Sequence, residues 1–256
     1  MTIEFSYQLY TSRNFFPLDR VLSMLRDAGI QKVEGFGGLY DDLPGLARAL
    51  KDFDMTMPSG HINLDTLEND PARAVDIAQT LGIENAYCPY LDASMRPTDS
   101  NSWQDFSKRL YGAGEPLREA GIGFGWHNHD FEFVPLADGS LPIDHLLGTE
   151  PRLEWEADIA WIIRARSDPL AALDRFGTRM TAVHIKDIAR PGEKTDEDGW
   201  DDIGAGTIDW ALLLDRIAAF ATKHVVLEHD NPSDDRRFTE RSLAYLNPLT
   251  SQAASS

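Results

Sequence analysis

The stretch GWHNHDFEF, residues 125–133, combines residue types that carry out acid–base and metal chemistry. His127 and His129 are two positions apart, and Glu132 follows shortly after. In a strand, side chains two residues apart point to the same face, whereas a helix would separate them by about 200°. Alternating glycine and aromatic residues over 121–126 favour a strand. A strand would bring both imidazoles to one site, although such a pair on its own is equally well explained by burial and backbone hydrogen bonds.

Other short β-rich runs also end in polar residues that could act as acids, bases or metal ligands. Two of these runs carry pairs with the same spacing: Glu156 and Asp158, then His184 and Lys186. Three more runs end in single residues, which are Glu34, His61 and Glu228. Buried ionisable groups are costly unless they are paired or bind a cation, so a ring of imidazoles and carboxylates predicts a metal site. Mixed ligands of this kind suit Mn²⁺, Co²⁺ or Zn²⁺, and Mg²⁺ is a further candidate.

The elements that must position these residues follow a regular alternation. β-rich runs cover residues 3–10, 32–35, 56–61, 85–88, 123–129, 153–158, 180–186 and 223–229. Amphipathic helical segments lie between them, at 18–29, 43–53, 71–82, 103–121, 168–177 and 208–221, with a shorter one at 141–148. This alternation predicts a single closed parallel (β/α)8 TIM barrel with its active site at the C-terminal mouth of the strands. An open doubly wound sheet is the alternative, but it usually has a glycine-rich phosphate loop after its first strand, and YQLYTSRNFF has none.

Local signals set several boundaries in this plan. Asp70 before Pro71 predicts a helix start, and Gly29 and Gly82 predict helix ends. We expect one barrel domain over residues 1–248 and a flexible tail at 249–256. The segment 189–206 after the seventh run is expected to be a long mobile loop.

Composition excludes several classes of partner. The chain has 42 acidic and 24 basic residues among 256, which gives a formal net charge of −18. Such a field repels nucleic acid and anionic membranes, although a metal or a few arginines can reverse it inside one cleft, so charge alone does not exclude a sugar phosphate. The single Cys88 excludes an internal disulfide, and no apolar stretch reaches the length of a membrane span. These features predict a cytoplasmic protein that neither binds nucleic acid nor enters a membrane.

Seven stretches, in their order and spacing, resemble the sugar phosphate isomerase/epimerase family of xylose-isomerase-like TIM barrels. They are VEGFGG, SGHINLD, GWHNHDFEF, EADIAW, AVHIKD, GAGTIDW and VVLEHDNP, and they extend over nearly the whole chain. The resemblance also reaches inosose dehydratases, dehydroshikimate dehydratase and, more remotely, endonuclease IV. It implies one divalent metal held by the fifth to eighth strands, on His127, Asp158, His184 and Glu228. Because such relatives are often dimers or tetramers, a homo-oligomer is also expected.

The sequence departs from the epimerases of this family at two places. The fifth-strand ligand of the epimerases is a glutamate, but this chain has His127, as the inosose-dehydratase-like branch does. A shift of register would bring His129 or Glu132 to the metal instead. In GAGTIDW, Ala205 stands where relatives commonly carry an acid, so one loop contact of the family is missing.

We therefore expect an isomerase or epimerase that acts on a small keto sugar or polyol derivative through a metal-stabilised enediolate. Glu228 is expected to be both ligand and base, and Lys186 to lie near the developing oxyanion. His129, Glu156 and Glu132 are the candidates for a second acid or base. Substrate contacts are expected from Glu34, His61, Trp126 and Trp161, and specificity from Tyr10, Arg13, Asp65, Tyr90 and Asp92 on loops.

Three alternatives stay open at this point. Loss of a β-hydroxyl from the same intermediate would make the protein a dehydratase of the inosose-dehydratase type. An endonuclease IV-like phosphodiesterase would need a zinc cluster and a basic surface, which the net charge opposes. A non-catalytic sugar-binding barrel would fit His127 and Ala205. Arg236, Arg237 and Arg241 could clamp a phosphate, although pairing with neighbouring acids on a helix surface is the more usual role of such residues.

Overall fold

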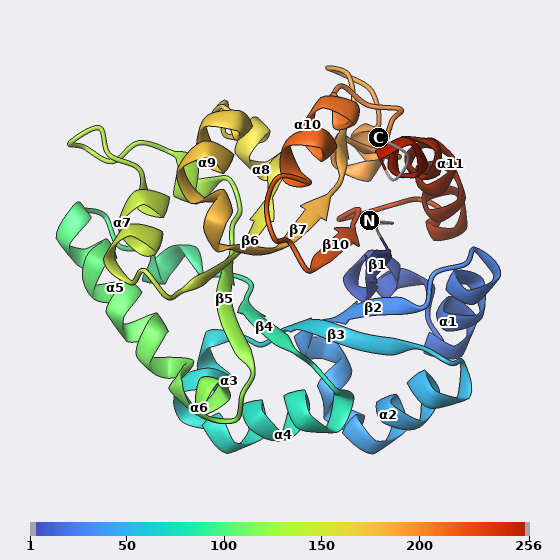
Figure 1. Cartoon of the computed structure of the whole chain (residues 1–256), viewed down its shortest axis with the longest axis horizontal. Coiled ribbons are helices and arrows are strands. Elements are labelled where there is room, and N and C mark those ends of the chain that lie inside the picture. Colours follow the sequence, from blue (N-terminus) through green and yellow to red (C-terminus); the bar gives the residue numbers. More distant parts are fainter. Residues whose placement is uncertain (1–3, 254–256) are drawn as a thin grey trace.

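Eight parallel strands close into a barrel in the computed structural model of the chain, which describes residues 4–253. Around the barrel the strand order is β1-β10-β7-β6-β5-β4-β3-β2, so each strand pairs with its neighbours in the ring. Figure 1 shows the strands gathered around the centre. Their bounds are β1 Phe5–Gln8, β2 Lys32–Gly35, β3 Thr56–His61, β4 Asn85–Cys88, β5 Gly123–His127, β6 Glu154–Asp158, β7 Met180–Ile185 and β10 His224–Leu227. The expected TIM barrel is confirmed.

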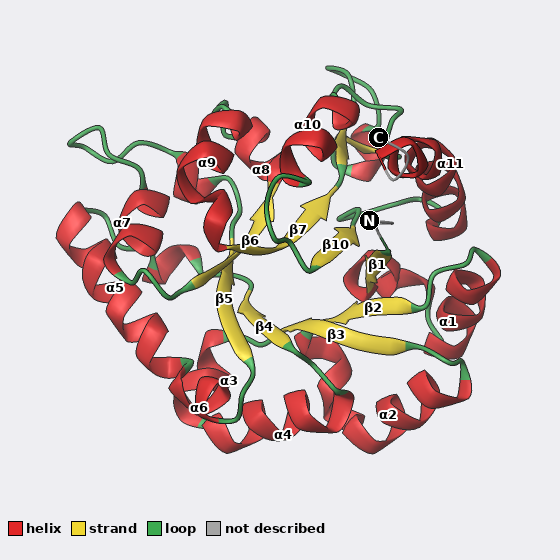
Figure 2. Ribbon diagram, in the orientation of Figure 1, coloured by secondary structure: helices red, strands yellow, loops and turns green. Residues whose placement is uncertain are grey.

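Helices form the outer layer and connect successive strands (Figure 2). They are α1 Leu18–Asp27, α2 Leu43–Asp52, α3 Leu64–Asn69, α4 Pro71–Leu81, α5 Ser100–Ala113, α6 Glu115–Glu119, α7 Pro142–Thr149, α8 Ile159–Arg164, α9 Pro169–Phe176, α10 Trp210–Ile217 and α11 Asp235–Ala253. As the connections require, each strand is followed by at least one helix before the next barrel strand begins. This arrangement is the right-handed crossover pattern that parallel strands need.

Short polar side chains start several of these helices. Asp70 accepts a hydrogen bond from the backbone N–H of Arg73 and is followed by Pro71, as the sequence indicates. At the other end of α4, Gly82 adopts a left-handed conformation with φ of 73°, which a glycine takes without strain. Gly29 ends α1 with φ of 86°. These caps satisfy backbone groups that a helix end leaves without partners.

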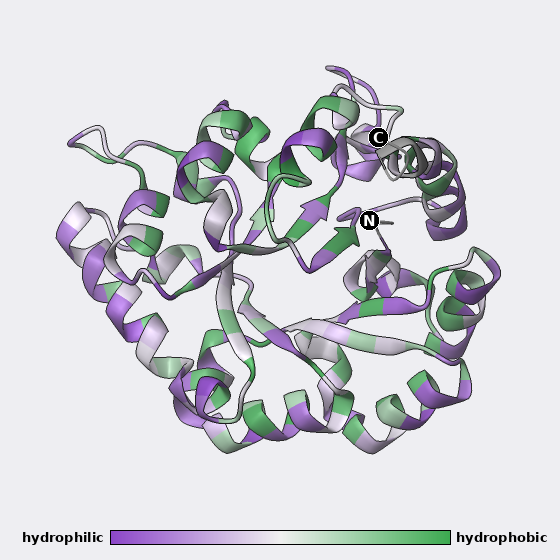
Figure 3. Cartoon of the chain, in the orientation of Figure 1, coloured by the Kyte–Doolittle hydropathy of each residue, from purple (hydrophilic) through white to green (hydrophobic). Residues whose placement is uncertain are grey.

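The apolar core lies between the strands and the helices. Figure 3 shows that the outer helices carry both hydrophobic and hydrophilic residues, which is the pattern of helices with one buried side. Large side chains fill the core, and the biggest fully buried ones include Trp103, Trp126, Trp155, Trp200 and Trp210. Inside the barrel the polar residues are concentrated near the strand ends, as described for the site below.

The observed boundaries differ from the expected ones in a few places. β2, β3 and β4 have the predicted bounds, but β5 ends at His127, so His129 belongs to the following loop. The expected helix at 103–121 is divided into α5 and α6 at Gly114. Pro116 lies in the first turn of α6, where its missing N–H needs no partner, whereas it would break a continuous helix.

The segment 189–206, expected to be a mobile loop, is folded onto the barrel. The short strand β9 Trp200–Asp201 of this segment pairs antiparallel with β8 Asp187–Ile188, which directly precedes it. The buried carboxylate of Asp187 accepts backbone N–H groups from Gly204 at 2.8 Å and from Thr207 at 3.0 Å. A Cβ atom on Gly206 would lie 2.2 Å from Asp187 Oδ1. The two glycines of GAG thus let the backbone close around this carboxylate.

The last helix extends into the segment expected as a tail. α11 runs to Ala253, and residues 254–256 of the expected tail lie outside the described residues. Within residues 4–253, no helix combines the length and the apolar character that crossing a membrane requires.

Candidate metal and substrate site

The C-terminal ends of four neighbouring strands bring two histidines and two acids together. His127 is the last residue of β5, Asp158 is the last of β6, and His184 lies near the end of β7. Asp158 and His184 are register partners across the β6–β7 pair, which places their side chains next to each other. Glu228 directly follows β10. The pairing of the barrel strands therefore explains why residues 26 to 101 positions apart in the sequence meet.

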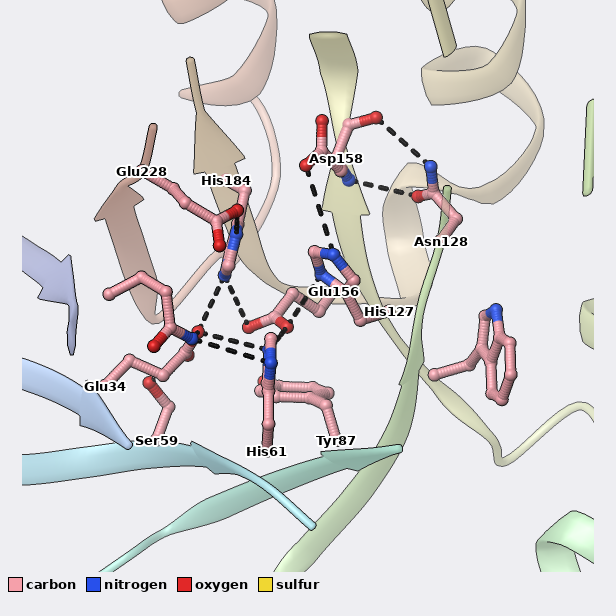
Figure 4. Close-up of polar contacts among 12 residues, drawn as sticks. Glu34, Ser59, His61, Tyr87, His127, Asn128, Glu156, Asp158, His184 and Glu228 are labelled. Carbon is pink, nitrogen blue, oxygen red and sulfur yellow. Dashed lines mark hydrogen bonds and ion pairs between the residues drawn. The ribbon is translucent and has the colours of Figure 1, made fainter. Parts of the chain in front are cut away.

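These four residues form the upper cluster. One ligand atom from each lies within 4.8 Å of the others. His184 Nδ1 is 2.7 Å from Glu228 Oε2, and His127 Nε2 is 4.0 Å from Asp158 Oδ2. All four side chains are buried or nearly so, and Figure 4 shows them converging from separate strands. Two imidazole nitrogens and two carboxylate oxygens are a donor set that suits Zn²⁺, Mn²⁺ or Co²⁺.

Beneath them lies a deep cluster made of Glu34, His61 and Glu156. His61 Nε2 is 2.6 Å from Glu156 Oε2 and 3.2 Å from Glu34 Oε1. Glu34 also accepts hydrogen bonds from the Gln8 amide at 2.8 Å and the Ser59 hydroxyl at 2.5 Å. Burial opposes a charge on His61, but the two carboxylates outweigh it and raise the pKa of His61 to about 9. This cluster is therefore a paired set of buried charges.

The two histidines of the upper cluster also contact the deep one (Figure 4). His184 Nε2 is 2.7 Å from Glu34 Oε1, while its Nδ1 faces Glu228. His127 Nδ1 is 3.0 Å from Glu156 Oε2, while its Nε2 faces Asp158. Each ring thus has one nitrogen in the upper cluster and the other beside a deep carboxylate. A carboxylate on the far nitrogen is the arrangement that fixes the tautomer and orientation of metal-binding histidines.

Lys186 supplies positive charge to the acids of the upper cluster. Its ammonium is 2.9 Å from Asp158 Oδ2, 2.7 Å from Glu228 Oε2 and 3.1 Å from Asp230 Oδ1. Burial disfavours the charged form of Lys186, but these carboxylates outweigh that effect and raise the pKa of Lys186 above its ordinary range. Burial likewise opposes a charge on Glu228, but Lys186 and His184 lower the pKa of Glu228. Both groups are therefore charged at neutral pH.

Several buried polar atoms at this site lack a well-formed hydrogen bond. Asp158 Oδ2, His127 Nδ1 and Glu156 Oε1 are buried and have none, although they lie within ion-pair distance of Lys186, Glu156 and His184, respectively. Buried polar atoms in native proteins nearly always have partners, so such exceptions need an explanation. A divalent cation bound by the upper cluster would provide one for Asp158 Oδ2, and the residues present fit that group.

A cavity of about 510 Å³ opens above the upper cluster. Its aromatic lining comes from Tyr10, Phe36, Tyr90 and Trp161. Its polar lining comes from Arg13, His61, His127, His129, Asp198, Glu228 and Asp230. This cavity is at the end of the barrel where the chemistry of such folds takes place.

Most of the residues expected at the site lie on this cavity or directly below it. His129 faces the cavity beside Tyr90 and Trp161, with ring centroids 5.2 and 5.3 Å away. Of the loop residues expected to set specificity, Tyr10, Arg13 and Tyr90 line the cavity, whereas Asp65 and Asp92 are not among its lining residues. Glu34 and Glu156 are fully buried in the deep cluster. Glu34 was expected to contact a substrate, but it contacts His184 and His61 instead.

Glu132 and Trp126 lie behind the site. The Trp126 indole donates to Glu132 Oε1 at 2.7 Å, and the backbone N–H of His129 donates to Glu132 Oε2 at 2.9 Å. Both side chains are fully buried, and Trp126 packs against Phe106. Glu132 therefore holds the loop that carries His129. Trp126 was expected to contact a substrate, but it forms part of the apolar core.

Asp230 is a cavity residue that the sequence analysis did not select. It follows Glu228 by two positions, which is the same spacing that singled out the pairs on β6 and β7. Its Oδ1 contacts Lys186, and its Oδ2 is buried without a hydrogen-bond partner. The alternation rule applied past the end of the strand would have found it.

Solved structures share this fold. A sugar phosphate isomerase/epimerase from Parabacteroides distasonis superposes with a TM-score of 0.78 at 20% identity, covering 96% of this chain and 94% of that one. The probable 3-DHS dehydratase AsbF of Bacillus anthracis gives 0.74 at 12% identity, covering 96% and 99%. IolI, solved with a bound zinc atom, gives 0.75 at 14% identity, covering 98% and 99%. At such identities the likeness establishes the fold alone.

Sequence comparison extends over the same length. The rhizopine catabolism protein MocC of Rhizobium meliloti is 23% identical over 274 residues, covering 93% of this chain and 82% of MocC. The family model described as xylose isomerase-like TIM barrel matches residues 5–249. The chain therefore belongs to the xylose isomerase-like TIM barrel family, whose structural neighbours here include isomerases, epimerases and dehydratases.

Proposed function

We propose that the protein is a divalent-metal-dependent isomerase or epimerase that acts on a small keto sugar or polyol derivative. The observation that carries this proposal is the upper cluster, in which four donor atoms converge below a cavity of substrate size. The zinc bound in IolI supports a metal in a barrel of this fold. His127, Asp158, His184 and Glu228 are the residues that would hold the cation.

A divalent cation in this position would polarise a substrate carbonyl and make the neighbouring C–H more acidic. Glu228 lines the cavity and is ionised, so its carboxylate is placed to accept a proton from that carbon. His129 faces the same cavity, and its Nδ1 is buried without a hydrogen-bond partner. It is our candidate for the second acid or base.

Where the proton returns decides the product. Return to the same carbon from the opposite side inverts it, and return to the adjacent carbon gives an isomer. Glu228 follows β10 and His129 lies in the loop after β5, so the two residues approach the cavity from different sides and could act on two positions of a substrate. Lys186 contacts Glu228 and holds positive charge beside it, which favours the ionised base.

Dehydration is the second candidate function, and one observation favours it. The fifth barrel strand, β5, contributes His127 to the upper cluster. The site therefore lacks a carboxylate on β5 that could act together with Glu228 as a second acid or base. A single carboxylate base with a neutral partner suits the loss of a β-hydroxyl after proton removal. The dehydratase AsbF shares the fold.

Metal analysis and isotope exchange test the proposal. The purified protein should contain about one divalent metal per chain, and His184→Ala and Glu228→Ala should lose it. His224→Ala is the matched control, because His224 is a buried barrel histidine at the opposite end, hydrogen-bonded to Asn85. It should retain the metal.

Incubation in deuterium oxide with a panel of keto sugars should then introduce deuterium at one carbon of a substrate. Exchange without a new isomer, together with loss of water, would favour the dehydratase. Failure of the wild type to bind metal would contradict the proposal, and metal without exchange on any sugar would leave a binding protein.

A further inference from the structure

The cavity above the upper cluster is lined by more negative than positive charge. Glu228, Asp198 and Asp230 contribute carboxylates. Among the described residues that line it, Arg13 is the sole lysine or arginine. His61 is also cationic, but its charge is taken up by Glu156 and Glu34 at 2.6 and 3.2 Å.

One nitrogen of the Arg13 guanidinium is already occupied by backbone carbonyls. Its Nη1 donates to the backbone carbonyls of Tyr10 at 3.0 Å and Asp230 at 2.5 Å. Its carbon centre lies 3.9 Å from the centroid of the Tyr10 ring. Arg13 therefore ties the loop after β1 to the loop after β10, which leaves only part of one guanidinium for a ligand, fewer donors than a phosphate dianion needs.

The cations around the rim are occupied in the same way. Arg96 donates to the Leu91 carbonyl at 3.0 Å and the Tyr90 hydroxyl at 2.7 Å. Arg164 donates to the Asp198 carbonyl at 2.6 Å and stacks 3.3 Å above the centroid of the Trp200 ring. These arginines hold the aromatic walls together.

The arginines of α11 do not form a phosphate clamp either. Arg237 pairs with Glu197 at 2.6 Å and with Asp202 at 3.2 Å. Arg236 and Arg241 also contact acids. The cations near this end of the barrel thus bind the protein's own acids and carbonyls.

From this arrangement we propose that the cavity takes an uncharged, hydroxylated ring, that is, a sugar or cyclic polyol without a phosphate group. The inference rests on the proposed function and narrows its substrate class. A phosphate dianion needs several charge-assisted donors, and in the part of the cavity away from the metal ligands it would meet Asp198 and Asp230 instead. The net charge of −18 adds a repulsive field around the same entrance.

The remaining lining suits a ring with hydroxyl groups. Tyr10, Phe36, Tyr90 and Trp161 offer aromatic faces to the C–H surface of a sugar. Asp230 Oδ2 and His129 Nδ1 are buried and have no hydrogen-bond partner, so both can bind substrate hydroxyls. The volume of about 510 Å³ lies in the range of small-molecule sites.

Matched ligand pairs test the inference directly. The metal-loaded protein is examined by saturation-transfer NMR with fructose and fructose 6-phosphate, tagatose and tagatose 6-phosphate, and inositol and inositol 1-phosphate. The unphosphorylated member of at least one pair should bind, and its phosphate should bind about tenfold or more weakly, as like charges at short range predict. Metal content is measured in the same samples.

Two charge variants identify the cause. Asp198→Asn removes one negative charge from the cavity. It should reduce the difference in affinity between an unphosphorylated ligand and its phosphate several-fold. Asp54→Asn is the control, because Asp54 also has a left-handed backbone, with φ of 55° against 57° at Asp198, but lines a cavity at the other end of the barrel. It should leave this difference in affinity unchanged.

Tighter binding of the phosphorylated members would overturn the inference. So would failure of every unphosphorylated sugar to bind. In that case the metal content reports separately whether the metal part of the proposed function survives. An equal response of Asp198→Asn and Asp54→Asn would show that the charge of the cavity does not select the ligand.

Discussion

The two ends of the barrel interior have similar residue types but differ in how completely they are paired. At the N-terminal end, Glu154 accepts hydrogen bonds from Asn85 at 2.6 Å and Thr181 at 3.1 Å. Tyr87 contacts Thr181 at 2.9 Å, and His224 contacts Asn85 at 3.2 Å. Each of these groups has a partner. At the C-terminal end, by contrast, His129 Nδ1 and Asp230 Oδ2 are buried without a hydrogen bond.

The difference shows that buried histidines and acids do not by themselves mark a functional site. The N-terminal cluster is complete, so its polar atoms stabilise the barrel and need nothing from outside. The C-terminal cluster is incomplete in a direction that faces a cavity. Since unsatisfied buried groups are costly, those that line the cavity indicate a ligand that completes them.

The strongest test of this difference is to replace one lysine at each end of the barrel. Lys186→Met leaves Asp158, Glu228 and Asp230 without their common cation. Because an uncompensated buried charge is strongly destabilising, we expect a loss of about 3–5 kcal/mol in the free energy of unfolding, measured by urea denaturation with a chelator present.

The control for this change is Lys223→Met. Lys223 is exposed at the opposite end and is expected to change stability by about 0.5 kcal/mol or less. Adding a divalent metal should restore much of the loss in Lys186→Met, because the metal would bind the same carboxylates. Equal losses in the two variants would refute the comparison.

Glu132 gives the next largest effect, through pH. Burial raises the pKa of Glu132 to about 8, against an ordinary value of 4.5. The folded state therefore keeps this proton longer than the unfolded state, so Glu132 lowers stability as pH rises from about 4.5 to about 8, by a few kcal/mol in all. Its contribution does not change outside this window.

Glu132→Gln should flatten the stability profile over this window, because an amide does not titrate there. The variant also loses one acceptor for Trp126 or for the His129 backbone, which lowers stability by about 1 kcal/mol at every pH. Urea midpoints at several pH values provide the measurement. Glu119→Gln, at an exposed position, should keep the wild-type profile, and an unchanged slope in Glu132→Gln would disprove the assignment.

The barrel was predictable from sequence because its signals are local. The runs that became β2, β3 and β4 have clear turns on both sides, and their bounds agree with the structure. Asp70, Pro71 and Gly82 determine the ends of α4 through the chain's own geometry. Alternation of such elements then leaves few possible folds.

The site was predictable only as far as strand alternation reaches. The alternation of side chains along the strands predicted that His127, Asp158 and His184 lie at one end of the barrel. It could not predict how far below the cavity each side chain lies. Glu34 therefore proved to lie below the mouth, paired with His184 and His61. Trp126 faces the helices because it is one residue out of phase with His127. The segment 189–206 looked mobile by composition, and only the tertiary contact with Asp187 orders it.

The third prediction tests whether a glutamate that lies below the cavity supports metal binding. It compares the substitution of one glutamate at each end of the barrel. Glu34→Gln replaces the carboxylate beside His184 Nε2 with an amide of the same shape. Since such partners orient and polarise the metal-binding ring, metal affinity should fall by about 10–100-fold in a chelator competition assay. Glu154→Gln, in the N-terminal cluster, should leave metal affinity within about twofold of wild type, as distant sites act independently. An equal loss in both variants would mean that Glu34 acts only on stability.

The smallest effect is expected at the loop that closes around Asp187. Gly206→Ala would place a Cβ atom 2.2 Å from Asp187 Oδ1 and 2.5 Å from the Ile188 carbonyl. Because backbone and a bound carboxylate cannot easily move, the clash should cost about 1–3 kcal/mol in the free energy of unfolding.

Ala205→Asp tests the residue next to Gly206, the middle position of GAG, by adding an acid there. Ala205 is exposed, and its backbone N–H bonds to the Asp202 carbonyl, which the substitution leaves in place. Stability should therefore change by about 0.5 kcal/mol or less. A large loss in Ala205→Asp with none in Gly206→Ala would show that the loop depends on the middle residue of GAG and not on the approach of its backbone to Asp187.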